Sequence, residues 1–185
     1  MNRRFIFLYG LFAGALMFIA VYGFKVINPM YDAWIFATSD PDIKQHYLGW
    51  CHFRTSPWSF PIGLIDSLSY PFPQSCLWTD SIPLFAIFFK LFRGILPEIF
   101  QYLGLYGLIS MALMGGFSAL LVERVTRGTS GERILPFLGV FPFILSAPVL
   151  QRMFYHTSLS AHFFIIIALL IMLDNPHEYP VRKLF

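Results

Sequence analysis

Long runs of apolar residues, separated by short charged clusters, are the main pattern along the chain. Residues 5–24 contain no charged residue over 20 positions and directly follow Arg3 and Arg4. A helix rises about 1.5 Å per residue, so this run would be about 30 Å long, the thickness of the hydrocarbon core of a bilayer. A signal peptide has a shorter apolar core and a cleavage site of small residues, and residues 20–23 offer no good site. The pattern predicts an uncleaved spanning helix with its N-terminus inside.

Three further uncharged runs are long enough to cross a membrane. They cover residues 99–122, 134–151 and 153–173, which are 24, 18 and 21 positions. Prolines at positions 136, 142 and 148 remove backbone donors, so the third span is expected to be kinked or broken near its outer end. Four spans are therefore expected, and a re-entrant hairpin formed by the third and fourth runs is the alternative.

The segment 25–97 lies between the first two spans and holds all four Trp residues. Prolines at positions 57, 61, 71, 73 and 83 divide it, which favours short helices and turns ordered against the headgroup region. Within it, residues 81–89 are apolar but too short to cross before Lys90 and Arg93. They predict an amphipathic helix in the membrane interface, with a fifth crossing as the alternative.

Composition supports a membrane protein. The 185 residues are 57% hydrophobic and 12% charged, with a mean hydropathy of +0.64, whereas soluble domains carry about 25% charged residues. This excess excludes a soluble monomer. The sequence predicts one all-α domain, residues 1–185, built as a polytopic helix bundle with a long ordered outer loop. The net charge is +3, and the 13 Lys and Arg residues are scattered along the chain. They form no basic stripe of the kind that binds nucleic acid.

Basic residues beside the spans favour cytoplasmic N- and C-termini. Three arginines fall within the short loop 123–133, where the positive-inside bias acts most strongly. The outer cations are spread over a much longer segment, so they have less influence on the orientation. The inner set is Arg3, Arg4, Arg124, Arg127, Arg133, Arg182 and Lys183, and the outer set is Lys25, Lys44, Arg54, Lys90, Arg93 and Arg152.

The two cysteines, Cys51 and Cys76, lie in the same outer segment. Two free thiols flanked by apolar residues are the more common arrangement in a small membrane loop. A disulfide in an oxidising compartment is the alternative.

Candidate chemistry begins at residues 39–50. Asp42 and His46 are four positions apart and share a face of a helix that starts after Pro41. A carboxylate near a helix N-terminus is electrostatically favoured. The alternative is structural: Asp40 is then a helix cap and Asp42 an ordinary first-turn acid.

Two later clusters fall on the same predicted outer side. In one of them, either Thr79 or Asp80 caps the interfacial helix, or Asp80 instead points back at Asp42. Arg152 and His156 share a helical face, although an arginine at a membrane boundary often only reaches the headgroups. His162, deeper in the fourth run, is more typical of a hydrogen-bonded contact between helices. Together these groups fit chemistry on a lipid with an anionic headgroup.

Common catalytic motifs are absent from the sequence. No G-x-S-x-G indicates a serine hydrolase, and no glycine-rich loop leads to Lys-Ser or Lys-Thr. Neither C-x-x-C nor H-E-x-x-H occurs, so the usual zinc patterns are also absent.

The combination of motifs resembles the GT-C superfamily of integral-membrane glycosyltransferases, and more closely a bacterial membrane family of uncharacterised function assigned to it. One span, a long outer loop with an acidic motif and a following bundle carry the resemblance. The matching runs are DIKQHYLGW at 42–50, Phe53-Arg54, WSFPIG at 58–63, TDSIPL at 79–84, Arg152 and HTSLSAH at 156–162.

The resemblance implies transfer of a sugar from a polyprenyl phosphate or diphosphate to a glycan, lipid or protein acceptor outside a bacterial inner membrane. Asp42 is the implied base, and Asp40 is the neighbouring candidate because Pro41 and the second acid depart from the family pattern. GT-C cores contain more than four spans, so the chain is expected to be an N-terminal piece of a longer protein.

The remaining expectations concern binding. Arg152, His156, His46 and Arg54 are the expected donor-phosphate or substrate-binding residues, and Asp40 with Asp80 would hold a divalent ion such as Mg²⁺ or Mn²⁺. The main alternative is a non-catalytic lipid carrier, flippase-type protein or membrane subunit whose outer residues only bind a lipid headgroup. A structural scaffold, which would not bind lipid phosphate, is the third.

Overall fold

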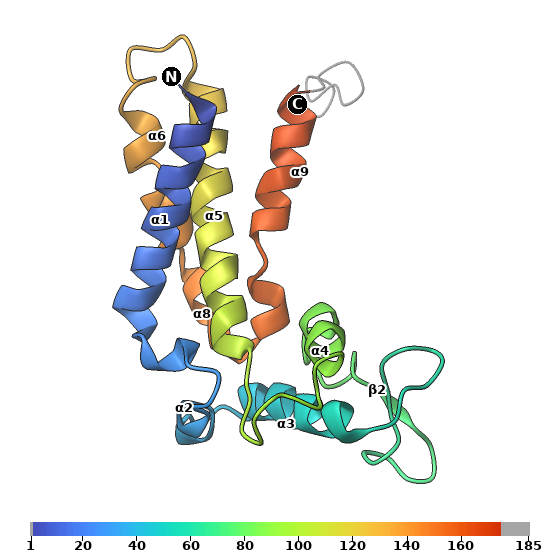
Figure 1. The fold of residues 1–185 in the computed structure, drawn as a ribbon. Coiled ribbons are helices and arrows are strands. Elements are labelled where there is room, and N and C mark those ends of the chain that lie inside the picture. The colour runs from blue at the N-terminus through green and yellow to red at the C-terminus, as the bar shows by residue number, and fades with distance from the viewer. Residues whose placement is uncertain (1, 175–185) are drawn as a thin grey trace. The chain divides into compact units, whose positions relative to one another are not determined.

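The computed structural model describes residues 2–174, and these residues are mostly helical (Figure 1). A short antiparallel pair of strands, with Leu64 opposite Ser75, was not predicted from the sequence. The elements are α1 (Arg3–Tyr22), η1 (Lys25–Ile27), α2 (Ala33–Ala37), α3 (Pro41–Thr55), β1 (Leu64–Ile65), β2 (Gln74–Ser75), α4 (Pro83–Lys90), α5 (Leu103–Thr126), α6 (Leu135–Leu138), α7 (Phe141–Ile144), α8 (Ala147–Tyr155), η2 (Thr157–Ser160) and α9 (Phe163–Asp174).

Three stretches within the described residues are long and apolar enough to cross a bilayer: Arg3–Tyr22, Leu103–Thr126 and Thr157–Asp174. A fourth candidate is the pair Leu135–Ile144 and Ala147–Tyr155, which is bent by 46°. The break that the prolines predict is therefore present. These candidate spans identify an integral membrane protein.

The second span begins at Leu103 rather than at residue 99 because side chains hold the preceding residues out of the helix. The Trp50 indole donates to the Phe100 carbonyl at 2.9 Å, and the Gln101 amide donates to the carbonyls of Val26 and Asn28, both at 2.8 Å. The last span also begins later than expected. Residues up to Tyr155 still belong to α8, and a 3₁₀ turn follows.

The chain divides into two compact units. Within the described residues, unit 1 comprises residues 2–23, 108–150 and 160–174, and unit 2 comprises residues 24–107 and 151–159. Arg182 and Lys183, expected on the inner side, lie outside the described residues.

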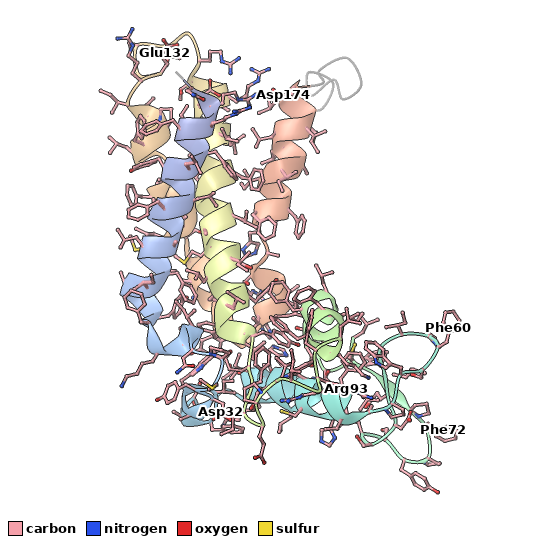
Figure 2. All side chains as sticks on the ribbon, viewed as in Figure 1. Asp32, Phe60, Phe72, Arg93, Glu132 and Asp174 are labelled. Atoms are coloured by element: carbon pink, nitrogen blue, oxygen red, sulfur yellow. The ribbon has the colours of Figure 1, made fainter. Side chains whose placement is uncertain are left out.

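In unit 1, α1 and α5 run side by side (Figure 1). Gly10 and Gly115 face each other so closely that a Cβ on either would overlap the other's backbone. Such small residues let membrane helices approach closely. At one end of the unit, where Figure 2 labels Glu132 and Asp174, the Arg124 guanidinium donates to Asp174 at 2.8 Å. Arginines of the predicted inner side are thus paired there with acids.

Unit 2 is organised around α3, whose buried face includes Ile43, Tyr47, Trp50 and Phe53. Aromatic rings of α4 pack beside it; Phe89, for example, stacks on Tyr102 with ring centroids 5.4 Å apart. The loops around the strands instead project their rings outward, as Figure 2 shows for Phe60 and Phe72. Short helices and turns therefore make up most of this segment, as the prolines predict, together with the strand pair.

Both cysteines of unit 2 are free thiols, Cys51 partly exposed and Cys76 buried. Burial raises the pKa of each thiol. The disulfide alternative is not what the structure contains.

Candidate functional site

The site begins at the N-terminus of α3. Asp40 is the cap of this helix: its carboxylate accepts the backbone N–H of Asp42 at 2.8 Å, and Pro41 occupies the first helical position. Capping satisfies a donor that the helix would otherwise leave unpaired, and proline suits a position without an intrahelical partner. The structural alternative for Asp40 is therefore the one observed.

Asp42, in the first turn of the helix, lies within hydrogen-bonding distance of His156. Its Oδ2 lies 2.9 Å from Nδ1 of the imidazole, and the two side chains are 36% and 47% exposed. His156 directly follows α8, and its backbone N–H donates to the Arg152 carbonyl at 3.2 Å. Residues 114 positions apart in sequence thus meet at a surface that solvent or substrate can reach.

A pocket of about 450 Å³ adjoins this pair and is lined by Gln151, Arg152, Tyr155 and His156. Within residues 2–174, the Arg152 guanidinium takes part in neither a hydrogen bond nor an ion pair. A guanidinium presents five N–H donors in a rigid fork that matches phosphate. The pocket therefore offers an uncompensated cation beside an imidazole.

The third acid, Asp80, is held by the same segment of chain. The Ser158 hydroxyl donates to Asp80 Oδ2 at 2.7 Å, and His46 Nε2 lies 3.9 Å from that oxygen. Asp80 and Ile82 both adopt left-handed backbone conformations, with φ of 53° and 51°. Such values are uncommon outside glycine and often occur at functional sites. Asp80 does not cap α4, whose N-cap is Ile82.

Close packing against α3 fixes the turn that carries Asp80. The buried His46 has Nδ1 3.0 Å from the Thr79 carbonyl, which only accepts, so Nδ1 carries a hydrogen. The Ser81 hydroxyl donates to the His46 carbonyl at 2.8 Å. A Cβ on Gly49 would overlap the side chains of Thr79 and Ser81, so this turn requires glycine at that position of the helix. His46 therefore supports the turn that carries Asp80 and does not line the pocket.

Arg54 lies elsewhere. It is in the last turn of α3, 12 residues beyond Asp42, which corresponds to about 18 Å along the helix. Its guanidinium donates to the carbonyls of Leu96 and Glu98 at 2.8 and 3.1 Å. The structure thus brings Asp42, His156 and Arg152 into one region and places Arg54 at the opposite end of the helix.

The expected divalent ion has no evident ligand set. Among residues 2–174, no group of three or more His, Cys, Asp or Glu side chains is arranged to hold a metal. Asp40, one of the two expected ligands, already uses its carboxylate as the helix cap. The described residues therefore offer no preformed ligand set for the ion, and no chemical step is assigned to it.

Sequence spacing missed two residues of the site. Ser158 donates to Asp80, and the Tyr106 hydroxyl donates to the Ser158 carbonyl at 3.3 Å. Ser158 falls within the HTSLSAH run, in which the sequence indicated a role only for the two histidines. Tyr106 lies inside an apolar helix, and no local pattern separates it from a packing residue.

Comparison with known proteins gives a family but no activity. Residues 11–184 match the model of a family described as a domain of unknown function, DUF6311. No curated protein and no solved structure matches the chain. The similarity to GT-C enzymes therefore rests on the quoted residues alone.

Proposed function

Because the chain belongs to the DUF6311 family, which has no assigned function, we propose its activity from the site itself: transfer of a sugar from a polyprenyl-phosphate donor to an acceptor at the membrane surface. The observation that carries the proposal is the Asp42–His156 pair, 2.9 Å apart, beside a pocket that contains Arg152. A paired acid and imidazole can move a proton, and an unpaired guanidinium can hold a phosphate.

His156 is the group that meets the acceptor in this proposal. Its Nδ1 faces Asp42, so Nε2 is left to accept a proton, and His156 lines the pocket whereas Asp42 does not. The Asp42 carboxylate fixes the tautomer and stabilises the imidazolium that forms, as an orienting acid does in a catalytic triad. The base expected at Asp42 from the sequence thus becomes a two-residue base.

The reaction is a single displacement at the anomeric carbon. The acceptor oxygen forms a bond to that carbon while its proton passes to His156 Nε2. The bond from the anomeric carbon to the phosphate oxygen breaks, and polyprenyl phosphate leaves with the electron pair. Arg152 holds the donor phosphate and balances the charge that develops on it.

Asp80 acts through positioning. Its contacts with Ser158 and His46 tie the segment that carries His156 to the turn beside α3. This arrangement keeps the imidazole near Asp42, and orientation of reacting groups is worth several kcal/mol in catalysis.

The proposed location is a bacterial inner membrane with a cytoplasmic N-terminus and the loop 25–97 on the outer side. Its support is the three arginines in residues 123–133 and the positive-inside rule. Single cysteines introduced between Lys44 and Trp78, in a chain without Cys51 and Cys76, should react with an impermeant thiol reagent in intact cells. One introduced at Thr129 should not, and its labelling would reverse the orientation.

The activity is tested with membranes that contain the full-length protein and a panel of polyprenyl-phosphate hexoses, by measuring release of polyprenyl phosphate. Asp42→Asn should slow release by about 100-fold to 10,000-fold, the contribution typical of a general base or acid. Asp66→Asn, an exposed acid away from the site, is the matched control. A lipid carrier would bind these donors and release no polyprenyl phosphate, with or without Asp42, and that result would overturn the proposal.

A further inference from the structure

Three cations gather at the C-terminal end of α3, away from the proposed site. Arg54 belongs to the helix itself, while Lys90 and Arg93 come from α4 and the turn after it. Lys90 Nζ donates to the Pro57 carbonyl at 3.2 Å, and the Arg93 guanidinium donates to the Ser56 carbonyl at 2.8 Å. Figure 2 labels Arg93 in this region. Lys90 and Arg93 therefore contact backbone oxygens just beyond the end of α3.

These charges are not balanced by acids. In the part of the chain that the structure describes, none of the three forms an ion pair with a carboxylate. Lys90 is only 1% exposed and lies 3.8 Å from the centre of the Phe53 ring. Its burial, and then the charge of Arg93, lower the pKa of Lys90. Carbonyl dipoles satisfy hydrogen bonds but leave the net positive charge in place.

A pocket of about 550 Å³ opens beside the two arginines. Cys51, Arg54, Thr55, Arg93, Gly94 and Glu98 line it. The carbonyl contacts above use two N–H groups of Arg54 and one of Arg93, and each guanidinium has five. Most donors are therefore available to a ligand, and Glu98 supplies the only carboxylate among the lining side chains.

The surface next to this pocket is apolar and exposed. Five large side chains recur at helical spacing along α4 and the turn that follows, and the last of them, Ile95, is 82% exposed. Soluble amphipathic helices direct apolar residues inward and charges outward. Here Lys90 is buried, whereas these five apolar side chains are exposed. The exposed set is Leu84, Phe88, Leu91, Phe92 and Ile95.

We propose that the Arg54–Arg93 pocket binds the phosphate of an anionic membrane lipid, whose hydrocarbon chain lies along the exposed stripe of α4. A free phosphate would satisfy the arginines but would not cover Phe92 and Ile95. The lipid is favoured because candidate spans keep the chain in a membrane and because the apolar stripe adjoins the cations. This site is separate from the proposed donor site and does not depend on the proposed activity.

The test is lipid retention by the purified, delipidated full-length protein, measured by native mass spectrometry during titration with phosphatidylglycerol. Arg93→Gln should weaken retention by about 10-fold or more, since a hydrogen bond between charged groups contributes about 1.5–3 kcal/mol. Phe92→Ser should weaken phosphatidylglycerol retention but not binding of inorganic phosphate. The matched control is Arg127→Gln, an exposed arginine of unit 1, which should change neither.

The outcomes distinguish a membrane lipid from free phosphate as the ligand of this pocket. Unchanged retention in Arg93→Gln, with an unchanged thermal midpoint, would overturn the site. Equal losses in Arg93→Gln and Arg127→Gln would reduce it to general attraction of anionic lipid. Binding of inorganic phosphate with no lipid retention would show a site for free phosphate and overturn the lipid assignment. Loss of retention in Arg152→Gln alone would place the lipid in the other pocket, whether or not sugar transfer occurs.

Discussion

The two ends of α3 carry side chains of opposite charge, and these side chains have different partners. At the N-terminal end, Asp42 is paired with an imidazole at 2.9 Å. At the C-terminal end, the hydrogen bonds that Arg54, Lys90 and Arg93 donate among the described residues go to neutral carbonyls. Acids near a helix N-terminus and cations near its C-terminus both suit the helix dipole. Stability of the helix therefore explains the signs of the charges but not the difference in their pairing.

That difference separates two kinds of site. A paired acid and base can exchange a proton, so the N-terminal end suits a chemical step. Cations without counter-charges attract an anion, so the C-terminal end suits binding. Each prediction below alters one end, or the contact that holds it in place.

Outside the acid–base pair itself, the largest effect is expected at Arg152, the cation beside it. Arg152→Ala should lower kcat/KM for polyprenyl-phosphate donors by about 100-fold, and Arg152→Lys should recover only part of it because lysine cannot form two parallel hydrogen bonds to phosphate. Donor titration with the full-length protein measures this. Unchanged affinity and turnover in Arg152→Ala would show that the side chain only reaches headgroups.

The next effect concerns Gly49, which lets the Asp80 turn approach α3. Alanine is favoured over glycine in a helix by about 1 kcal/mol, but its Cβ would overlap Thr79 and Ser81. Overpacking of this kind typically costs about 1–3 kcal/mol. Gly49→Ala should therefore lower the thermal midpoint and the activity together.

Gly94→Ala is the control for Gly49→Ala, because nothing lies within 4 Å of a Cβ at that position. It should leave the thermal midpoint unchanged. Similar losses from the two substitutions would remove the packing explanation for Gly49.

A smaller effect separates Asp40 from Asp42. Asp40→Ala removes the cap of α3 and should cost about 1 kcal/mol of stability, whereas asparagine caps helices as well as aspartate does. Asp40→Asn should therefore retain both stability and transfer. If Asp40→Asn were inactive while Asp42→Asn was active, the base would have to be assigned to Asp40.

The smallest effect is the pH dependence that Lys90 introduces at the other end. Its pKa is lower in the folded protein than in the unfolded chain. The folded state then releases this proton first as pH rises, so the penalty of the buried charge is present at neutral pH and disappears toward pH about 10.4. Arg93, Asp66 and Cys76 are the charged or titratable groups that act on it.

Comparison with Lys90→Met isolates this contribution, because burial also raises the pKa of Tyr47, Cys51 and Cys76 in both proteins. Between pH 8 and pH 10 the wild-type thermal midpoint should rise relative to that of the variant. A constant difference between the two proteins would contradict the burial of a charged lysine.

The sequence predicts the membrane elements well because a charge-free run of about 20 residues has few stable structures other than a membrane-spanning helix. It could not predict where the second span begins, because that boundary depends on Trp50 and Gln101 binding distant carbonyls. Helical spacing paired Asp42 with His46 and Arg152 with His156. The structure instead pairs Asp42 with His156, and only the tertiary fold determines such a contact.

Arg54 shows the opposite error, a shared site that the sequence predicts and the structure does not contain. Its position in a motif with Asp42 predicts a shared site, but 12 helical residues separate the two side chains. Ser158 and Tyr106 have no spacing or composition that distinguishes them. Local sequence therefore identifies the acids and cations, and long-range packing decides which of them act together.

A double-mutant cycle across Asp42 and His156 tests the central claim most directly, with release of polyprenyl phosphate by the full-length protein as the readout. If the two residues form one base, Asp42→Asn, His156→Gln and the double variant should all be slowed by about the same factor, within the range of about 100-fold to 10,000-fold expected for acid–base catalysis. Losses that multiply in the double variant would show that the residues act independently, and would contradict the account.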